Sequence, residues 1–340
     1  REFCQKVQNS HALVVSSCTA ALHLALLINN VGPGDEVILP SLTFASTGHT
    51  VVHCGAIPVF GEVRENTYCL DPSHVETLVT SRTKAIVAVH YAGHPADLTA
   101  LREMAKSKGL ALIEDAAHAL GASREGRQIG DSGSTACFSF YTNKNITTAE
   151  GGMLTLPNEE QLARAERLSL HGLDRDAWKR FADGKKWRYS IEEFGFKYNA
   201  NDLLAALGRA QLSRLDEMHR KRHQVWDWYT SRLKGDSRFH LPPEEGVIDH
   251  ARHLYVLRLR EGVEIDRDQL VDSLRDQRIG ATVHYDPLHL HPAYRQRFRT
   301  GDGLLPLTER IAGRILSLPL HPKMSETDVE RVVLALGDSG

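Results

Sequence analysis

Cysteine is scarce in this sequence, and long apolar runs are absent. The 340 residues include five cysteines, an odd number without a Cys-x-x-Cys pair, which excludes a disulfide framework and a zinc ribbon. No window approaches the roughly 18 apolar residues of a membrane span, and no leader joins a charged start to an apolar middle. We therefore expect a cytoplasmic protein. Because the first residue is Arg1 rather than methionine, we also expect a further N-terminal segment.

An excess of positive charge is also missing. Lysine and arginine number 41 against 43 aspartate and glutamate residues, which gives a net charge of −2. This balance argues against a broad electrostatic surface for nucleic acid or for an anionic membrane. The 18 histidines include closely spaced pairs, but none has the neighbouring carboxylates or cysteines of a zinc site, so we expect no metal.

What the sequence does contain, up to about residue 156, is a regular alternation of short apolar runs and helical segments. This order is typical of an α/β fold in which helices cover both faces of a mostly parallel sheet. In such sheets, ligands bind at the carboxyl ends of the strands. The apolar runs are residues 12–15, 36–39, 57–60, 85–89, 110–113 and 135–140, and two of the helical segments are 20–28 and 98–107.

The second half of the sequence has a different organisation. A polar, charged region at 174–193 leads into a helical stretch at 202–233, which we interpret as a connector. We divide the chain into a large domain, residues 1–205, and a connecting helix with a small C-terminal α+β domain, residues 206–340. The elements expected in the small domain are apolar runs at 254–259 and 282–285 and helices at 266–275, 307–316 and 326–336.

Small hydroxyl residues form the first candidate site. Ser16, Ser17, Cys18 and Thr19 stand between a predicted strand and a predicted helix. Such a turn presents free backbone N–H groups at the positive end of the helix dipole, which makes a cup for phosphate. Serine and threonine are also ordinary helix N-caps, so this stretch alone leaves both interpretations open.

Two charged residues follow later strands. Asp115 follows Glu114 at the end of the apolar run 110–113, where a buried carboxylate needs a partner; a helix cap or a loop ion pair is the alternative. Lys144 lies a few residues past the run 135–140, among small hydroxyl residues and paired glycines. A lone lysine in a loop is ordinarily solvated, but here three elements converge on the same strand ends.

Together these residues meet the requirements of pyridoxal 5'-phosphate. The phosphate needs a cup, the pyridine nitrogen needs a carboxylate that keeps it protonated, and a lysine must form the Schiff base. An aromatic ring to stack on the pyridine is also expected. Phe44 follows another predicted strand end and suits this role, with core packing as its alternative.

Beyond these residues, the sequence resembles the DegT-type sugar aminotransferases, which are fold-type-I pyridoxal phosphate enzymes that act on nucleotide-linked keto sugars. The resemblance covers nearly the whole chain, and the segment from FSF to EGG is its most specific part. The matching stretches are residues 16–23 (SSCTAALH), 32–44 (GPGDEVILPSLTF), 89–97 (VHYAGHPAD), 114–121 (EDAAHALG), 138–152 (FSFYTNKNITTAEGG), 197–199 (KYN), 285–289 (YDPLH) and 316–320 (LSLPL).

The resemblance implies roles for the residues that face the cofactor. Lys144 forms the Schiff base, Asp115 pairs with the pyridine nitrogen and Phe44 stacks on the ring. His118 lies by the cofactor's 3'-hydroxyl, where the family more often has glutamine. On the same basis, the phosphate is held by Ser17, Cys18, Thr19 and Ser139.

The resemblance extends to the substrate, the partner subunit and the fold. It implies that Asn199 reaches the phosphate of the neighbouring subunit's cofactor, so that the active site belongs to a homodimer. His289 is similar to a family residue near the sugar substrate. The implied fold is a large domain with a mostly parallel seven-stranded sheet and a smaller C-terminal α+β domain.

The implied reaction is the transfer of an amino group, with L-glutamate as donor, to a nucleotide-linked keto sugar of the 4-keto-6-deoxy kind, within amino-sugar or polysaccharide biosynthesis. One alternative is a sugar dehydratase on the same scaffold, whose members replace the lysine, often with histidine. Another is a non-catalytic regulator that keeps the fold. Lys144 argues against the first, and the complete set of lysine, aspartate and phosphate cup argues against the second. Departures from the family pattern are Cys18, Ala200, Asn201 and Leu204.

Overall fold

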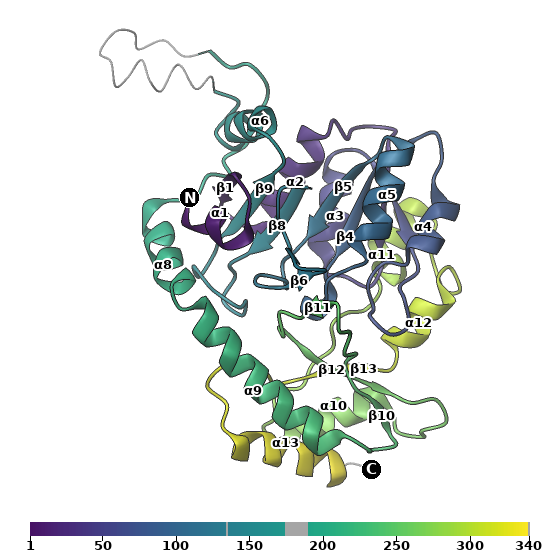
Figure 1. The fold of residues 1–340 in the computed structure, drawn as a ribbon. Coiled ribbons are helices and arrows are strands. Elements are labelled where there is room, and N and C mark those ends of the chain that lie inside the picture. Colours follow the sequence, from purple (N-terminus) through teal and green to yellow (C-terminus); the bar gives the residue numbers. More distant parts are fainter. Residues whose placement is uncertain (134, 174–189, 339–340) are drawn as a thin grey trace.

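The computed structural model describes residues 1–133, 135–173 and 190–338. The larger part of the molecule is built around a seven-stranded sheet, whose strands lie within residues 11–156. The strand order is β1-β9-β8-β5-β4-β2-β3 (Figure 1). All neighbouring strands are parallel except β9, which is antiparallel to both β1 and β8. The predicted mostly parallel sheet is therefore confirmed. Its strands are β1 His11–Val15, β2 Glu36–Pro40, β3 Ile57–Gly61, β4 Thr83–Val89, β5 Ala111–Asp115, β8 Thr135–Ser139 and β9 Gly152–Leu156.

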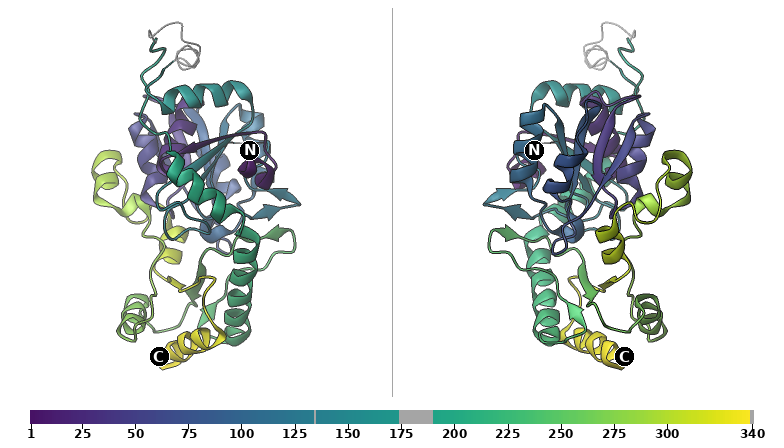
Figure 2. Two further views of the ribbon diagram at one scale, coloured as in Figure 1. Left: turned by 90° about the vertical axis from the view of Figure 1, so that its left-hand side faces the viewer. Right: turned by 90° about the vertical axis from the view of Figure 1, so that its right-hand side faces the viewer.

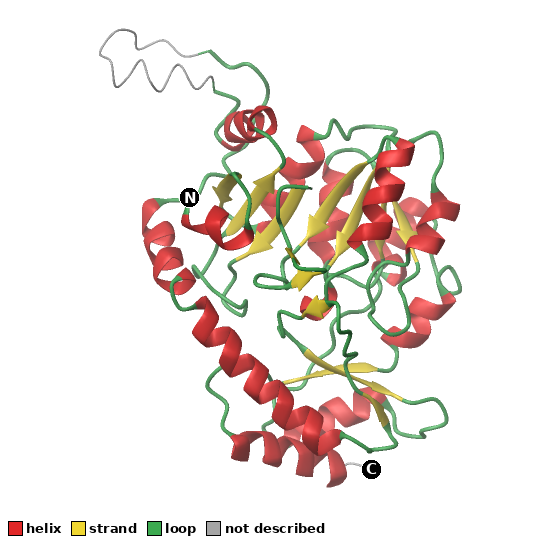
Figure 3. Cartoon of the chain, in the orientation of Figure 1, coloured by secondary structure: helices red, strands yellow, loops and turns green. Residues whose placement is uncertain are grey.

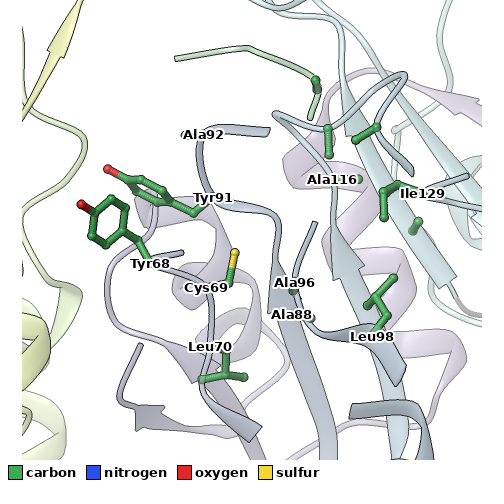
Figure 4. Packing of buried hydrophobic residues seen from close by; sticks show 14 of the residues in the cluster. Tyr68, Cys69, Leu70, Ala88, Tyr91, Ala92, Ala96, Leu98, Ala116 and Ile129 are labelled. Carbon is green, nitrogen blue, oxygen red and sulfur yellow. The ribbon is translucent and has the colours of Figure 1, made fainter. Parts of the chain in front are cut away.

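The central strands are apolar on both sides because helices cover both faces of the sheet (Figure 3). In β2, Val37 and Leu39 belong to a cluster that includes α2 (Cys18–Ile28), whereas Ile38 belongs to a cluster on the other face. Figure 4 shows part of that second cluster, which includes Ala88 of β4 and Leu98 of α5 (Leu98–Lys108). Because both faces of these strands are buried, their sequences are continuous apolar runs rather than alternating apolar and polar residues.

Helix α2 is the most enclosed helix that contacts the sheet, since all its residues except Thr19 and Leu27 are buried. Its N-cap is Ser17, whose Oγ accepts a hydrogen bond from the backbone N–H of Ala20 at 3.1 Å. This cap places the start of α2 at the end of β1. The remaining helices of the larger part are α1 Glu2–Val7, α3 Ala45–His53, α4 Pro72–Leu78, the 3₁₀ helix η1 Tyr91–Gly93 and α6 Glu159–Ser169.

The connector differs from its prediction. Residues 174–189 of the predicted polar region lie outside the described residues, and the predicted helix at 202–233 is two helices, α8 Asp202–Leu212 and α9 Leu215–Leu233. The break occurs because Arg214 leaves the helical conformation (φ −105°, ψ 2°) and its N–H bonds the carbonyl of Gln211 at 3.1 Å, which tightens the last turn of α8. Figure 1 shows α8 beside the large sheet and α9 extending to the smaller part.

The smaller part has its own sheet and core (Figure 2). Helices α9, α10 (Arg267–Asp276) and α13 (Glu326–Asp338) pack on a three-stranded sheet. The strands are β10 Phe239–His240, β12 Tyr255–Leu259 and β13 Ile315–Leu318, and the remaining short elements are β6 Ser123–Arg124, β7 Arg127–Gln128, β11 Ile248–Asp249, η2 Leu288–Leu290 and α11 Pro292–Phe298.

Two predicted elements of the smaller part change. The helix predicted at 307–316 ends earlier, as α12 (Pro306–Ala312), because Ile315 already pairs with Arg258 of β12 as the first residue of β13. The apolar run predicted at 282–285 forms no strand; only Thr282 makes a bridge, to Ser317. In the part of the chain that the structure describes, no helix combines the length and apolar character needed to cross a membrane.

Candidate active site

Several strands of the large sheet meet at one edge. Asp115 at the end of β5 pairs with Val89 at the end of β4. Ser139 of β8 and Val15 of β1 both pair with Gly152, the first residue of β9. The segments that follow β1, β4, β5 and β8 therefore leave the sheet side by side, as parallel topology requires.

A cavity of about 470 Å³ opens at this edge. It brings together the predicted site residues from four separate segments, whereas Asn199 and His289 lie outside its lining. The predicted residues that line it are Ser17, Cys18, Thr19, Phe44, Asp115, His118, Ser139 and Lys144.

Lys144 presents an amine to this cavity. Its backbone N–H donates to the carbonyl of Tyr141 at 3.0 Å, while its side-chain amine has no hydrogen bond to the described residues. Burial lowers the pKa of Lys144, and the neighbouring Cys18 and Asp115 oppose that shift. A larger share of this amine is neutral near pH 7 than for an exposed lysine, and a neutral amine is both a nucleophile and a base.

Asp115 lines the cavity and is held in one orientation. It is 5% exposed; Oδ2 accepts from the hydroxyl of Thr47 at 2.7 Å, and Oδ1 accepts from the N–H of Ala117 at 3.2 Å. Because Thr47 uses its only hydroxyl proton on Asp115, Thr43 must donate to Thr47 across their 2.9 Å contact. Burial raises the pKa of Asp115 despite these hydrogen bonds, so its carboxylate gains from any cationic group that enters the cavity.

The start of α2 forms the wall beside Lys144. The first N–H groups of a helix have no acceptor within it. Ser17 satisfies two of them, since its Oγ accepts from Ala20 and its carbonyl accepts from Ala21, each at 3.1 Å. The N–H groups of Cys18 and Thr19 remain for a bound anion, which the helix dipole also favours.

Gly152 allows this turn to approach the sheet. A Cβ at residue 152 would lie 2.5 Å from the carbonyl carbon of Ser17 and 2.6 Å from the amide nitrogen of Cys18. Both are backbone atoms and cannot rotate away. Gly152, the second glycine of the EGG motif, is therefore required for the turn at Ser17 and Cys18 to lie this close to β9.

We expect Gly152→Ala to weaken binding of pyridoxal phosphate about 10- to 100-fold, because relieving such overlap costs about 1–3 kcal/mol. A fluorescence titration of the cofactor-free protein measures this affinity. The matched control is Gly280→Ala, since a Cβ there meets no atom within 4 Å. Equal affinities for the two variants would contradict the role of Gly152.

An aromatic side and a polar side complete the cavity. Phe44 is 59% exposed, which excludes core packing, and its ring centroid lies 5.8 Å from that of Tyr285. His118 belongs to the polar side of the cavity. It is 8% exposed, and its Nε2 lies 3.2 Å from the hydroxyl of Tyr285. Its Nδ1 is buried without a partner among the described residues. Burial and the nearby Lys144 hold the pKa of His118 well below its ordinary value, so the ring is neutral.

Sequence reasoning did not single out several residues that belong to this site. Tyr91, His284 and Tyr285 line the cavity, and Tyr91 donates to the carbonyl of His284. Thr47 orients Asp115 from α3. The stretches 89–97 and 285–289 carried a signal for Tyr91 and Tyr285, since they match the family pattern. Thr47 and His284 become visible only when distant segments are packed together.

The two remaining predicted residues occupy other positions. Asn199 is exposed beside β1, where its Oδ1 accepts from the Lys197 amine at 2.6 Å. His289 is fully buried, with Nδ1 at 2.7 Å from Ser41 Oγ and Nε2 at 3.0 Å from Glu309. Both ring nitrogens of His289 are thus occupied within the protein.

These observations fit a pyridoxal phosphate site. The cavity offers an amine and a ring nitrogen of His118 that have no hydrogen-bond partner among the described residues, together with a buried carboxylate and N–H groups at a helix start. They match the four polar parts of that cofactor: the aldehyde, the ring nitrogen, the phosphate and the ring hydroxyl. Within residues 1–133, 135–173 and 190–338, no group of three or more His, Cys, Asp or Glu side chains is arranged to hold a metal ion.

Comparison with known proteins gives a consistent result. The DegT/DnrJ/EryC1/StrS aminotransferase family matches residues 1–337. Spore coat polysaccharide biosynthesis protein SpsC of Bacillus subtilis is 43% identical over 340 residues, which covers 99% of this chain and 87% of that protein.

Solved structures agree with the sequence match. The putative sugar aminotransferase Spr1654 from Streptococcus pneumoniae, in its PMP form, superimposes with a TM-score of 0.94 at 30% identity, covering 100% of this chain and 90% of that one. DesV from S. venezuelae gives a TM-score of 0.90 at 36% identity, covering 99% and 86%.

Proposed function

Because the chain belongs to the DegT/DnrJ/EryC1/StrS aminotransferase family, we propose that it transfers an amino group from L-glutamate to a nucleotide-linked keto sugar. It is a sugar aminotransferase, and its cofactor is pyridoxal phosphate. We further propose a 4-keto-6-deoxy sugar as acceptor and polysaccharide or amino-sugar biosynthesis as the setting. The similarity to SpsC, named for spore coat polysaccharide biosynthesis, supports this setting.

The observation that carries the proposal is the placement of Lys144 and Asp115 in one cavity beside the start of α2. When bound there, pyridoxal phosphate supplies an electron-accepting ring that stabilises negative charge at the donor's α-carbon. Asp115 would hold the proton on the ring nitrogen, and the N–H groups of Cys18 and Thr19 would hold the phosphate. Phe44 would cover one face of the ring.

Lys144 has two tasks in this proposal. It links the cofactor in the resting enzyme, and as a free amine it takes the proton from the donor's α-carbon on Nζ. Its lowered pKa suits the second task, because a base must be neutral before it accepts a proton. The same Nζ then returns a proton to the sugar carbon that receives the amine.

Substrate identity is tested with a panel of nucleotide-linked keto sugars. The cofactor-loaded protein is incubated with L-glutamate and each sugar, and mass spectrometry follows 2-oxoglutarate and the amino sugar. We expect equal amounts of the two products with at least one 4-keto-6-deoxy sugar. Turnover of 3-keto sugars alone would contradict the proposed acceptor, and loss of a hydroxyl without amine transfer would favour the dehydratase.

We also propose that the enzyme is a homodimer with shared active sites. No residue of α8 is buried, and two of its leucines are exposed, as are two apolar residues of the preceding segment. Large exposed apolar patches commonly mark interaction surfaces. We propose that Asn199, which lies just before the N-cap of α8, reaches into a neighbour's site. The exposed apolar residues are Ile191 (60%), Phe194 (97%), Leu203 (83%) and Leu207 (41%).

Mixed dimers provide a test of the shared site. We expect Lys144→Ala and Asn199→Ala to be inactive alone but to regain turnover when refolded together, because one site of each mixed dimer then has an intact Lys144 and an intact neighbouring Asn199. Turnover is measured after mixing at increasing ratios. If Asn199 served the site of its own chain, that intact combination would not form, and mixing would restore no activity.

A further inference from the structure

The residue that follows Lys144 is almost fully buried. The side chain of Asn145 is 7% exposed, although Lys144 next to it lines the open cavity. A buried amide needs partners for its oxygen and its nitrogen, because burial removes the water that would otherwise bond them. The partners of Asn145 therefore show what fixes the loop between β8 and β9, in which Lys144 and Asn145 both lie.

Both ends of the Asn145 amide bond to a segment more than 100 residues further along the chain. Nδ2 donates to the carbonyl of Ala251 at 2.9 Å, which is 106 residues away. Oδ1 lies 3.0 Å from Nδ1 of His253, and because Oδ1 only accepts, His253 must carry its proton on Nδ1. Nδ2 also lies 3.5 Å from Nε2 of His219 on α9.

The segment 251–253 is itself fixed on two sides. The N–H groups of Ala251 and His253 donate to the carbonyls of Gly93 and Ala92, at 2.9 and 3.2 Å. The carbonyl of His253 accepts from the buried guanidinium of Arg222 on α9 at 3.4 Å. The segment is thus a rigid support that joins the loop after β4 to α9.

The support also touches the wall of the cavity. The ring centroid of His253 lies 4.4 Å from that of His118, which lines the cavity. Gly93 permits this approach: its φ is +97°, and a Cβ there would lie 2.9 Å from the carbonyl oxygen of His118 and 3.0 Å from Cβ of Ala251. The lysine loop, the support and His118 form one packed unit.

We propose that Asn145 is a positioning residue, which ties the loop to His253 and Ala251 and so fixes the backbone from which Lys144 reaches the cavity. This inference rests on the proposed function of Lys144. On the other side, the N–H of Lys144 bonds the carbonyl of Tyr141, so the loop is held before and after the lysine. Only the lysine side chain is then free to move between its two tasks.

Loss of the Asn145 contacts has a defined consequence. A loosened loop lets the Lys144 amine move toward solvent, so the amine is less often at reacting distance. The same movement reduces the burial that lowers the pKa of Lys144. The titratable groups that face the amine are Cys18 on α2, Asp115 on β5, His118 after β5, His253 and His284.

The pKa of the Lys144 amine can be measured without the cofactor. The full chain, freed of cofactor, is labelled briefly with acetic anhydride over a pH series, and mass spectrometry quantifies modification of Lys144. We expect the labelling midpoint of Asn145→Ala and of His253→Leu to move to higher pH. His253→Asn retains an N–H donor near the position of Nδ1, so its midpoint should remain that of the wild type.

In the cofactor-loaded enzyme, we expect Asn145→Ala to lower kcat about 10- to 100-fold with an unchanged KM for L-glutamate, because small misplacement of a reacting group has effects of this size. The matched control is Asn9→Ala. Asn9 is also buried and donates from Nδ2 to the carbonyls of Gly130 and Asp131 at 2.9 and 3.1 Å, away from the cavity. The Asn9→Ala variant should be less stable than the wild type, while the pH midpoint for labelling of Lys144 should remain unchanged.

Each outcome decides the proposal. A wild-type midpoint for Asn145→Ala overturns it, as does a shift of equal size in Asn9→Ala. If Asn145→Ala does not fold, the comparison of His253→Leu with His253→Asn replaces it, and equal midpoints for these two variants overturn the proposal. Full turnover by Lys144→Ala would instead refute the proposed function, independently of the labelling result.

Discussion

Replacing Lys144 with alanine is expected to lower kcat for amino transfer from L-glutamate by about 10²- to 10⁴-fold, the usual contribution of a positioned proton-transfer group. Lys144 is the lysine that lines the cavity, and its amine has no hydrogen bond to the described residues. No other side chain of the lining combines a lowered pKa with a basic nitrogen that can form a covalent link to the cofactor.

The variant should still bind pyridoxal phosphate, because the N–H groups at the start of α2 are unchanged. Stopped-flow absorbance after addition of L-glutamate measures the first half of the reaction. Lys106→Ala is the control: Lys106 is an exposed lysine in the last turn of α5, and its loss should leave the rate unaltered. Unchanged half-reaction rates in Lys144→Ala would contradict the assignment.

Replacing Asp115 with asparagine is expected to lower kcat about 10²- to 10³-fold, in the range found when a preorganised electrostatic contact is removed. The neutral amide no longer favours a proton on the ring nitrogen. The fold should accept the change, because Oδ1 can still accept from Ala117 while Nδ2 donates to Thr47 and the threonine hydroxyls reverse their direction.

Stability provides the control for Asp115. Burial raises the pKa of this carboxyl in the folded protein, so at neutral pH its charge opposes folding of the cofactor-free chain. Asp115→Asn should therefore unfold at the same or a higher denaturant concentration than the wild type, while its turnover falls. A variant that loses stability and activity together would indicate a structural role for Asp115 instead.

The parts of the site that local sequence predicts are those that lie at strand ends. Ser17, Asp115 and Lys144 each follow a short apolar run, and parallel topology brings such positions to one edge of a sheet. The same reasoning predicted the parallel sheet, but it did not identify β9 as the antiparallel strand between β1 and β8.

Contacts between distant segments were not predictable from local pattern. Asn145 and His253 are 108 residues apart, and nothing in either neighbourhood indicates that they share a hydrogen bond. His289 is bonded to Ser41 and Glu309, residues of two other segments. The break between α8 and α9 depends on one tightened turn at Arg214, which apolar periodicity does not reveal.

The absorbance spectrum of the purified protein with pyridoxal phosphate, recorded before and after addition of L-glutamate, tests the roles of Lys144 and of the amino donor together. We expect a visible band from cofactor linked to Lys144, which glutamate converts to the ultraviolet band of the amine form, with release of one 2-oxoglutarate per site. A linked band that glutamate leaves unchanged would contradict the proposed donor. Absence of any linked band would contradict Lys144 as the residue that holds the cofactor.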